Sequence, residues 1–235
     1  FPNFVQAQQL FDCNKTEEAI DLLTTLVSRD VVNESTLMFS RQVCESLGQV
    51  EMAHDLWANY LRHIEGELSR KRSLAKRLRH ARRFEESLMV AKMVLKESVN
   101  DLQMLTLITE VAYRTSTPED AIDAFHQLES LGEVKLFHIR RYANAAIKVA
   151  SPDDMIRGVQ RLIGLEVDAN ATVRNSFLKL HELGATEKAE EILDLIQGTL
   201  LEIDLRAAIA LERGHPLEAI SLLEQGINEH PEHVS

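Results

Sequence analysis

The chain has 235 residues and a formal net charge of −11, with 26 Lys and Arg against 37 Asp and Glu. This charge argues against a nucleic acid or an anionic membrane as the main partner, because an acidic surface repels both. Only 9 Gly, 5 Pro and 5% aromatic residues are present, so tight turns and sheets are disfavoured. Leu, Ala, Glu and Arg, which favour helices, are frequent, and we expect an all-α fold without a membrane span.

A short segment of acidic and apolar residues recurs along the chain. It reads EEAIDLL at 17–23, EDAIDAF at 119–125 and LEAISLL at 217–223. Aligned on the alanine, the recurring position falls at Ala19, Ala53, Ser87, Ala121, Met155, Ala189 and Ala219. The first five intervals are 34 residues each and the last is 30. Apolar residues at helical spacing predict helices that stack on equivalent neighbours, because one short unit cannot bury its apolar face alone.

A period of 34 residues is that of the tetratricopeptide repeat, and the chain resembles that family over nearly its whole length. The resemblance implies an all-α fold, a right-handed superhelix (α-solenoid) of about seven helix–turn–helix repeats. We expect one array over residues 1–235, with the short last interval trimmed near Gly198. The expected repeats are 1–33, 34–67, 68–101, 102–135, 136–169, 170–199 and 200–233.

In this family the first helix of a repeat (helix A) ends in a left-handed turn, which Gly and Asn tolerate. Residues that match this turn are Asn14, Gly48, Gly184 and Gly214, and residues that depart from it are Arg82, Ser116 and Ala150. Small residues let helix A approach the second helix (helix B), and on helix A they are Ala7, Ala75, Ala143 and Ala207. Four residues after the aligned helix B alanine stand Leu23, Trp57, Phe125, Leu193 and Leu223, and Pro231 closes the last repeat.

A basic segment, SRKRSLAKRLRHARR at 69–83, stands out in this acidic chain. Arg72, Lys76 and Arg79 follow one another at spacings of four and three, so they share one face of a helix. The family resemblance implies that helix A lines a concave groove, and guanidinium groups hold carboxylates through two hydrogen bonds. We therefore predict that these residues bind an acidic partner segment. The alternative is a solvated face that balances the acidic helices B.

A second group resembles the clamp with which some tetratricopeptide domains hold a C-terminal carboxylate. That clamp has Lys or Arg, then Asn four residues later, and another Asn on the next helix A. The residues in this order are Arg140, Asn144 and Asn175, with Arg174 beside Asn175. The following repeat would need basic residues where Leu201 and Leu205 stand, so the clamp is incomplete.

Four apolar residues of the first two helices A leave two interpretations open. They are Phe4, Phe11, Met38 and Phe39. They either form a hydrophobic peptide pocket or pack against a preceding repeat, and we favour packing because the first repeat looks uncapped. Both ends of the sequence look uncapped, and we expect a fragment of a longer repeat protein or an array capped by oligomerisation.

Residues that carry chemistry give no enzymatic signature. The 9 His are scattered, without the i, i+4 pair of a helical metal site, and neither a Gly-rich phosphate loop nor a nucleophile elbow occurs. Cys13 and Cys44 are too few for a disulfide framework and fit small buried positions. We expect no catalysis, no metal and no cofactor.

The sequence thus predicts a non-catalytic scaffold that holds a protein partner in its concave groove. An alternative follows from a weaker resemblance to the periplasmic arrays of bacterial outer-membrane exopolysaccharide export proteins. Those arrays recruit a polymer-modifying enzyme and guide the polymer to an outer-membrane barrel, so biofilm polysaccharide would be a further partner. The compartment would then be the periplasm, and otherwise the cytoplasm. A third hypothesis makes the array an accessory region of an enzyme whose catalytic domain lies outside this sequence.

Overall fold

The computed structural model describes residues 2–28, 34–46, 48, 50–64 and 66–229. Within these residues the chain forms fourteen α-helices and one 3-10 helix and no β-strand, so the predicted all-α class is confirmed. The chain divides into two compact units, residues 1–74 and 75–235, and each is described by itself. A single array over the whole chain stays a prediction.

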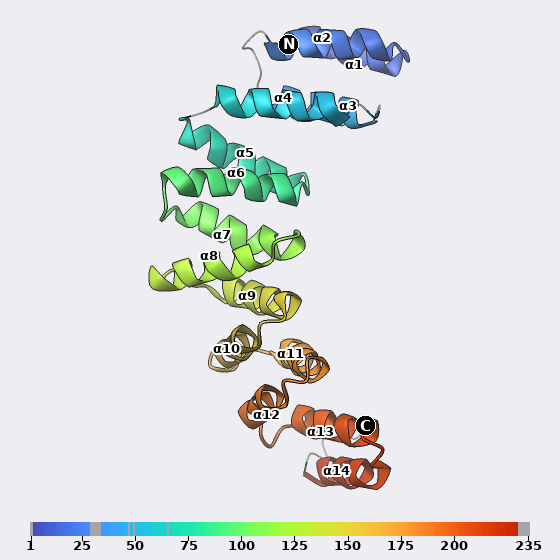
Figure 1. The fold of residues 1–235 in the computed structure, drawn as a ribbon, viewed down its shortest axis with the longest axis vertical. Helices are drawn as coiled ribbons and strands as arrows, with labels where there is room; N and C mark the ends of the chain where they lie inside the picture. The colour runs from blue at the N-terminus through green and yellow to red at the C-terminus, as the bar shows by residue number, and fades with distance from the viewer. Residues whose placement is uncertain (1, 29–33, 47, 49, 65, 230–235) are drawn as a thin grey trace. The chain divides into compact units, whose positions relative to one another are not determined.

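The first unit consists of helix hairpins. Its helices are α1 (Pro2–Asp12), α2 (Thr16–Ser28), α3 (Glu34–Ser46), α4 (Val50–His63) and the beginning of α5 (Leu68–His80). Helix α1 packs on α2, and α3 packs on α4 (Figure 1). Ala7, Leu23 and Val43 bring α1, α2 and α3 together in one apolar cluster. Burial of this cluster joins the two hairpins.

The apolar residues of the first two helices A are largely packing residues. Phe11 and Phe39 pack against the cluster of Ala7, Leu23 and Val43, so they belong to the core of the first unit. Met38 is half-buried, and the side chain of Phe4 lies outside the described residues. Because Phe11 and Phe39 lie in this core, the structure does not support a peptide pocket lined by all four residues.

The two cysteines differ in their surroundings. Cys44 is fully buried on α3, and burial raises the pKa of its thiol. Cys13 is exposed, so its predicted buried position is wrong. The reason is that Cys13 follows the last residue of α1 and lies in the turn, where no neighbouring helix covers it.

The second unit continues with tandem helix pairs. After the rest of α5 come α6 (Phe84–Glu97), α7 (Leu102–Val111), η1 (Ala112–Arg114), α8 (Glu119–Ser130), α9 (Leu136–Val149), α10 (Pro152–Ile163), α11 (Asn170–Glu182), α12 (Thr186–Leu195), α13 (Leu200–Glu212) and α14 (Pro216–Glu229). From α7 onward each odd-numbered helix packs on the even-numbered helix after it (Figure 1). Helix α7 also packs on α9, α9 on α11, and α11 on α13. These odd-numbered helices are the helices A of the predicted repeats and form one layer.

The turns between helices A and B adopt the left-handed backbone conformation even where the sequence departs from Gly. Arg82 and Ala150 both have φ of 60°. At Ala150 the turn is held because the next amide, of Ser151, donates to the carbonyl of Ala146, which is the hydrogen bond of a Schellman cap. The turn before Ser116 differs, because η1 extends α7 and Thr115 is extended, with φ of −96° and ψ of −175°.

Small residues mark the closest helix approaches. The predicted small residues are all buried, namely Ala7, Ala75, Ala143, Ala207, Ala19, Ala53, Ala121, Ala189 and Ala219. Ser87 fits the same position because its hydroxyl donates to the carbonyl of Ala75 at 2.8 Å. In the fifth repeat Met155 occupies this position, and Gly158 instead lies against Ala143.

The last two helix pairs carry the irregular spacing. Helix α12 has 10 residues against 12 in α10, and the connection after it, 196–199, is shorter than 164–169 after α10. The shortening therefore affects helix α12 as well as the predicted connection near Gly198. The large helix B position is buried at Leu193 but 41% exposed at Leu223 on α14. Pro231 lies outside the described residues.

Candidate partner-binding face

The candidate face consists of the exposed side chains of α5, α7, α9 and α11 in the second unit. The predicted binding residues on it are Lys76 and Arg79 of α5, Arg140 and Asn144 of α9, and Arg174 and Asn175 of α11. All are exposed except Arg79, which is half-buried. Because α7, α9 and α11 pack in succession, the residues of α9 and α11 belong to neighbouring helices of one layer, and Lys76 and Arg79 reach that layer through side-chain bonds to α7.

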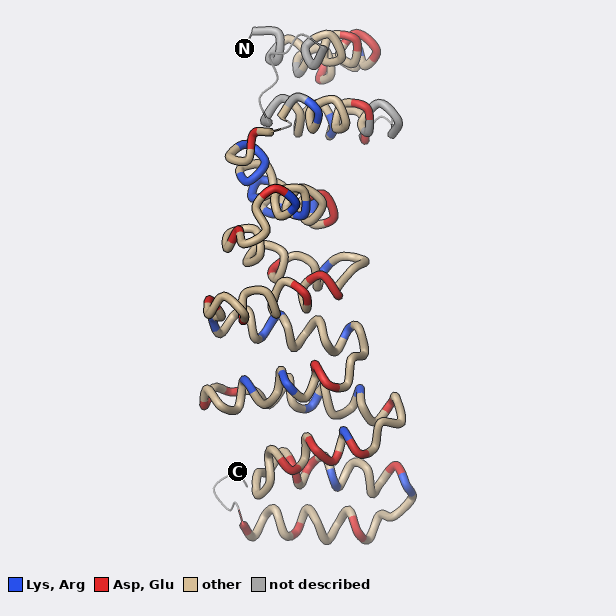
Figure 2. The backbone as a smooth tube through the Cα atoms, turned by 60° about the vertical axis from the view of Figure 1, so that its left-hand side comes forward, with Lys and Arg blue, Asp and Glu red and all other residues tan. Residues whose placement is uncertain are grey.

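Lys76 and Arg79 both reach the next helix A. The ammonium of Lys76 donates to Oε1 of Gln103 at 2.9 Å, and the guanidinium of Arg79 donates to Oε2 of Glu110 at 2.5 Å. Figure 2 shows Lys and Arg gathered on α5 in an otherwise acidic chain. The charge of Arg79 is therefore partly offset by Glu110, whereas Lys76 has a neutral partner there.

Arg72 was predicted to share this face. Arg72 lies on α5 together with Lys76 and Arg79, so the predicted helix through these three residues is confirmed. Its half-buried side chain belongs to the first unit, residues 1–74, so Arg72 is not part of the face described for the second unit.

The clamp-like group is only partly assembled. Arg140 and Asn144 lie on α9 and Asn175 lies on the adjacent α11. Arg174 makes an ion pair with Asp204 of α13 at 3.4 Å, so the next helix A supplies an acid where a clamp needs a base.

Leu201 and Leu205 were expected at the groove positions of α13. Both are buried, with 9% and 2% exposure, so that expectation is wrong. The rotation of α13 turns these leucines into the core and leaves Asp204 exposed. The spacing of residues along α13 could not predict this rotation, because the packing of α13 against α11 and α14 sets it.

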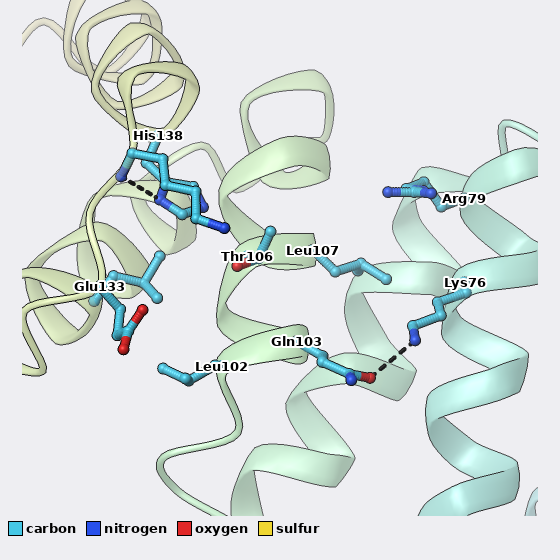
Figure 3. Close-up of a pocket in the computed structure, with 10 residues that line it drawn as sticks. Lys76, Arg79, Leu102, Gln103, Thr106, Leu107, Glu133 and His138 are labelled. Carbon is cyan, nitrogen blue, oxygen red and sulfur yellow. Dashed lines mark hydrogen bonds between the residues drawn. The ribbon is translucent and has the colours of Figure 1, made fainter.

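A cavity of about 420 Å³ opens between α5, α7 and the start of α9. Its lining residues are Lys76, Arg79, Leu102, Gln103, Thr106, Leu107, Leu128, Glu133, Lys135 and His138. Figure 3 shows Lys76 and Arg79 on one side, Glu133 and His138 on the other, and the α7 residues between them. Lys135 and His138 were not predicted from the sequence, because they stand at the start of α9 and are not part of the repeat pattern.

His138 is almost fully buried, with 1% exposure. The backbone amide of Lys135 donates to its Nδ1 at 3.1 Å, so Nδ1 must carry a lone pair. Burial, with a further contribution from the charge of Lys135, lowers the pKa of the imidazole. The neutral ring therefore carries its proton on Nε2, and that buried atom has no hydrogen-bond partner among the described residues.

A polar cluster at α9 and α10 has a structural role. Tyr142 and Ser151 donate from their hydroxyl groups to the carboxylate of Asp154, each at 2.6 Å, and His126 lies 3.5 Å from the same carboxylate. Ser151 thus donates to Asp154 and not to a histidine that could remove its proton, which a nucleophilic serine requires. The cluster fixes the α9–α10 pair instead.

The described residues also bear on metal binding and membrane insertion. No group of three or more His, Cys, Asp or Glu there is arranged to hold a metal ion. Likewise, no described helix combines the length and the apolar character needed to cross a membrane.

Comparisons with solved structures match the chain to proteins of low sequence identity. A crystal structure of MamA matches at 16% identity over 70% of this chain and 92% of that chain, with a TM-score of 0.49. YrrB, described as a TPR protein with an unusual peptide-binding site, matches at 13% identity over 75% and 93%, with a TM-score of 0.47. The structure of Naa15/Naa10 bound to HypK-THB matches at 13% identity over 99% of this chain and 37% of that chain, with a TM-score of 0.52. No protein-family profile and no curated protein matches the chain.

The fold follows from the repeat and the helix pairs together. A 34-residue period, paired helices and buried small residues at the aligned positions are the features of tetratricopeptide-repeat proteins. The chain therefore has the all-α fold of the tetratricopeptide-repeat class, in which tandem helix pairs stack as an α-solenoid.

Proposed function

We propose that this chain is a non-catalytic scaffold that binds an acidic segment of a partner protein along the helix A layer of its second unit. The observation that carries the proposal is the basic end of that layer, where Lys76 and Arg79 of α5 face α7. Arg140 adds positive charge on α9, whereas the charge of Arg174 on α11 is partly offset by Asp204. A partner with several carboxylates would be attracted to these side chains although the chain as a whole is acidic.

The stacked layer supports the proposal energetically. Helices α7, α9 and α11 are held by their packing partners before any partner arrives, so binding orders few additional residues. Asn144 and Asn175 are exposed beside the basic residues and offer amide groups to the backbone of an extended segment. This arrangement fits a peptide better than a small molecule.

The test is capture of partners from a native extract at low and at high salt. The wild type is compared with a Lys76→Glu, Arg79→Glu double variant and with a control that reverses one Lys and one Arg elsewhere, Lys96→Glu with Arg213→Glu, both exposed. We expect the wild type and the control to retain an acidic partner at low salt and the double variant to lose it. Equal retention by all three proteins would contradict the proposal.

The exopolysaccharide export alternative rests on the sequence resemblance and stays a prediction. Its test uses a cationic, partly deacetylated aminosugar polymer, whose attraction to the acidic surface should weaken with salt. Salt-sensitive binding of this polymer that persists in the Lys76→Glu, Arg79→Glu variant would favour the alternative over an acidic protein partner.

A further inference from the structure

The cavity between α5, α7 and α9 contains more positive charge than its surroundings compensate. Lys76, Arg79 and Lys135 line it, and Glu133 is the acidic residue of its lining. Glu110, outside the lining, pairs with Arg79. Three positive charges against two negative ones leave one positive charge without a counterpart. One carboxylate would match it, whereas a phosphate group at about −1.5 to −2 would exceed it.

The two lysines of the cavity are available to a ligand. Lys76 donates to the neutral amide of Gln103, and Lys135 forms no ion pair within the part of the chain that the structure describes. Other exposed cations of this chain do pair with an acid, as Arg174 does with Asp204 at 3.4 Å. The cavity therefore contains two lysines that form no ion pair with a carboxylate of the described residues.

His138 supplies an independent observation. Its Nε2 is buried and without a partner in the described residues, although the neighbouring Nδ1 is satisfied. A buried donor without an acceptor is destabilising because it loses its hydrogen bond to water, so such groups are rare in folded proteins. His138 lines the cavity, so an acceptor oxygen that enters the cavity and reaches Nε2 would satisfy this donor.

The size and the floor of the cavity point to a peptide. A volume of about 420 Å³ falls within the range of ligand pockets, roughly 300–1,000 Å³. It exceeds what a lone carboxylate fills, and Leu102, Leu107 and Leu128 provide apolar surface for the carbon atoms next to that carboxylate. The apolar floor also lowers the local dielectric constant, which strengthens each ion pair.

We propose that this cavity is the subsite of the scaffold that takes one carboxylate-bearing residue of the acidic partner segment. Lys76 and Lys135 pair with the carboxylate, and Nε2 of His138 donates a hydrogen bond to it. The inference rests on the proposed function and assigns to it one position, with Lys135 and His138 as specificity residues. The carboxylate comes from an Asp or Glu side chain or from the C-terminus of the segment.

The test uses three acetylated peptide probes and the complete chain. Hexaglutamate amide carries side-chain carboxylates, hexaglycine with a free C-terminus carries a terminal one, and hexaglutamine amide carries none. Affinity is measured by calorimetry for the wild type, Lys135→Gln and the matched control Lys96→Gln, which removes the same charge from an exposed lysine of α6. The ¹⁵N and ¹H signals of the His138 side chain are recorded in the wild type during each titration.

We expect an acidic probe to bind the wild type, with affinity about fivefold or more weaker in Lys135→Gln, or about 1 kcal/mol, and nearly unchanged in Lys96→Gln. The Nε2–H signal of His138 should shift with that probe and not with hexaglutamine. The probe that produces both effects identifies the source of the carboxylate. A His138→Gln variant is not required, so a folding defect from the loss of its bond to Lys135 does not obscure the result.

Two outcomes would overturn the inference, and they differ in what they imply for the scaffold. If Lys135→Gln and Lys96→Gln weaken the acidic probes equally, the cavity is not the subsite, and the proposed function is retained provided that Lys76→Glu with Arg79→Glu abolishes binding. If neither acidic probe binds the wild type at about 1 mM, roughly −4 kcal/mol, then the acidic-segment function fails as well.

Discussion

Ala143 on α9 and Gly158 on α10 approach so closely that a Cβ atom on Gly158 would lie 2.9 Å from Cβ of Ala143 and 3.1 Å from its Cα. Gly158 therefore takes the role that Ala has at other helix B positions. The contact also explains how the fifth repeat accommodates Met155 at the position expected to be small.

The first prediction concerns this contact. Gly158→Ala adds helix propensity worth about 1 kcal/mol, but the new methyl group meets atoms of Ala143 that no side-chain rotation can move away. Overpacking costs about 1–3 kcal/mol, and the upper part of this range applies here because a backbone atom of Ala143 is in the way. After the gain in helix propensity is subtracted, we expect a net loss of about 1–2 kcal/mol in the free energy of unfolding. Urea unfolding followed by circular dichroism measures it.

Gly226→Ala is the matched control for that substitution. Its methyl group would meet a side-chain methyl of Ile203 at 3.1 Å, which rotation can relieve. We expect a smaller loss than for Gly158→Ala, or a gain. A Gly158→Ala protein as stable as the wild type would show that the α9–α10 contact tolerates expansion.

The second prediction concerns the left-handed turn at Ala150. A non-Gly residue with φ of 60° carries steric strain of about 1 kcal/mol that Gly does not. Ala150→Gly should therefore stabilise the protein by about 0.5 kcal/mol after the greater entropy of Gly in the unfolded chain is subtracted. Ser116→Gly is the comparison, because Ser116 occupies the corresponding turn without a positive φ, and we expect it to destabilise the protein. Thermal unfolding measures the melting temperature of both variants. A lower melting temperature for Ala150→Gly than for the wild type would contradict the prediction.

The third prediction concerns Asp154. Partial burial by itself raises the pKa of this carboxyl group, but hydrogen bonds from Ser151 and Tyr142, with the nearby His126, outweigh it and lower the pKa. A pKa lowered by folding stabilises the protein above the unfolded-state value of about 3.9, and this stabilisation is lost as the pH falls through the folded-state value. Asp154→Asn should cost about 1–3 kcal/mol at pH 7.

The difference between wild type and Asp154→Asn should shrink as the pH falls below about 4. Urea midpoints measured between pH 7 and pH 2.5 give this difference directly. Asp153→Asn removes the same charge one residue earlier, from a side chain that is 87% exposed, and should have little effect. If the stability difference between wild type and Asp154→Asn does not change with pH, the substitution acts through packing and not through the charge of the carboxylate.

The fourth prediction concerns the pair formed by Arg79 and Glu110. Glu110→Gln removes the negative charge that partly offsets Arg79, so acidic peptides should bind about two- to fivefold more tightly at low salt. The gain should disappear at about 0.5 M salt, because screening weakens interactions between exposed charges. Calorimetry with acetyl-hexaglutamate amide measures both values.

Glu119→Gln removes an equal charge from an exposed residue at the start of α8 and serves as the control. Tighter binding in both variants would indicate a change in overall charge alone. Unchanged binding in Glu110→Gln would place the acidic segment away from Arg79.

The sequence by itself determined the helices, their pairing and their turns. Those features depend on local periodicity, and the 34-residue spacing puts Ala19, Ala53 and Ala121 in equivalent buried places without any knowledge of the tertiary structure. The left-handed turns at Gly184 and Gly214 are also local, because φ is restricted within one residue.

Only the tertiary structure decided which charges are compensated and which positions are buried. Arg79 meets Glu110 across 31 residues of sequence, and Arg174 meets Asp204 across 30. Such pairs depend on the rotation of each helix against the next helix A, and the same rotation buries Leu205. The cavity with Lys135 and His138 arises in the same way, since residues without a repeat pattern come together only when three successive helices A have packed.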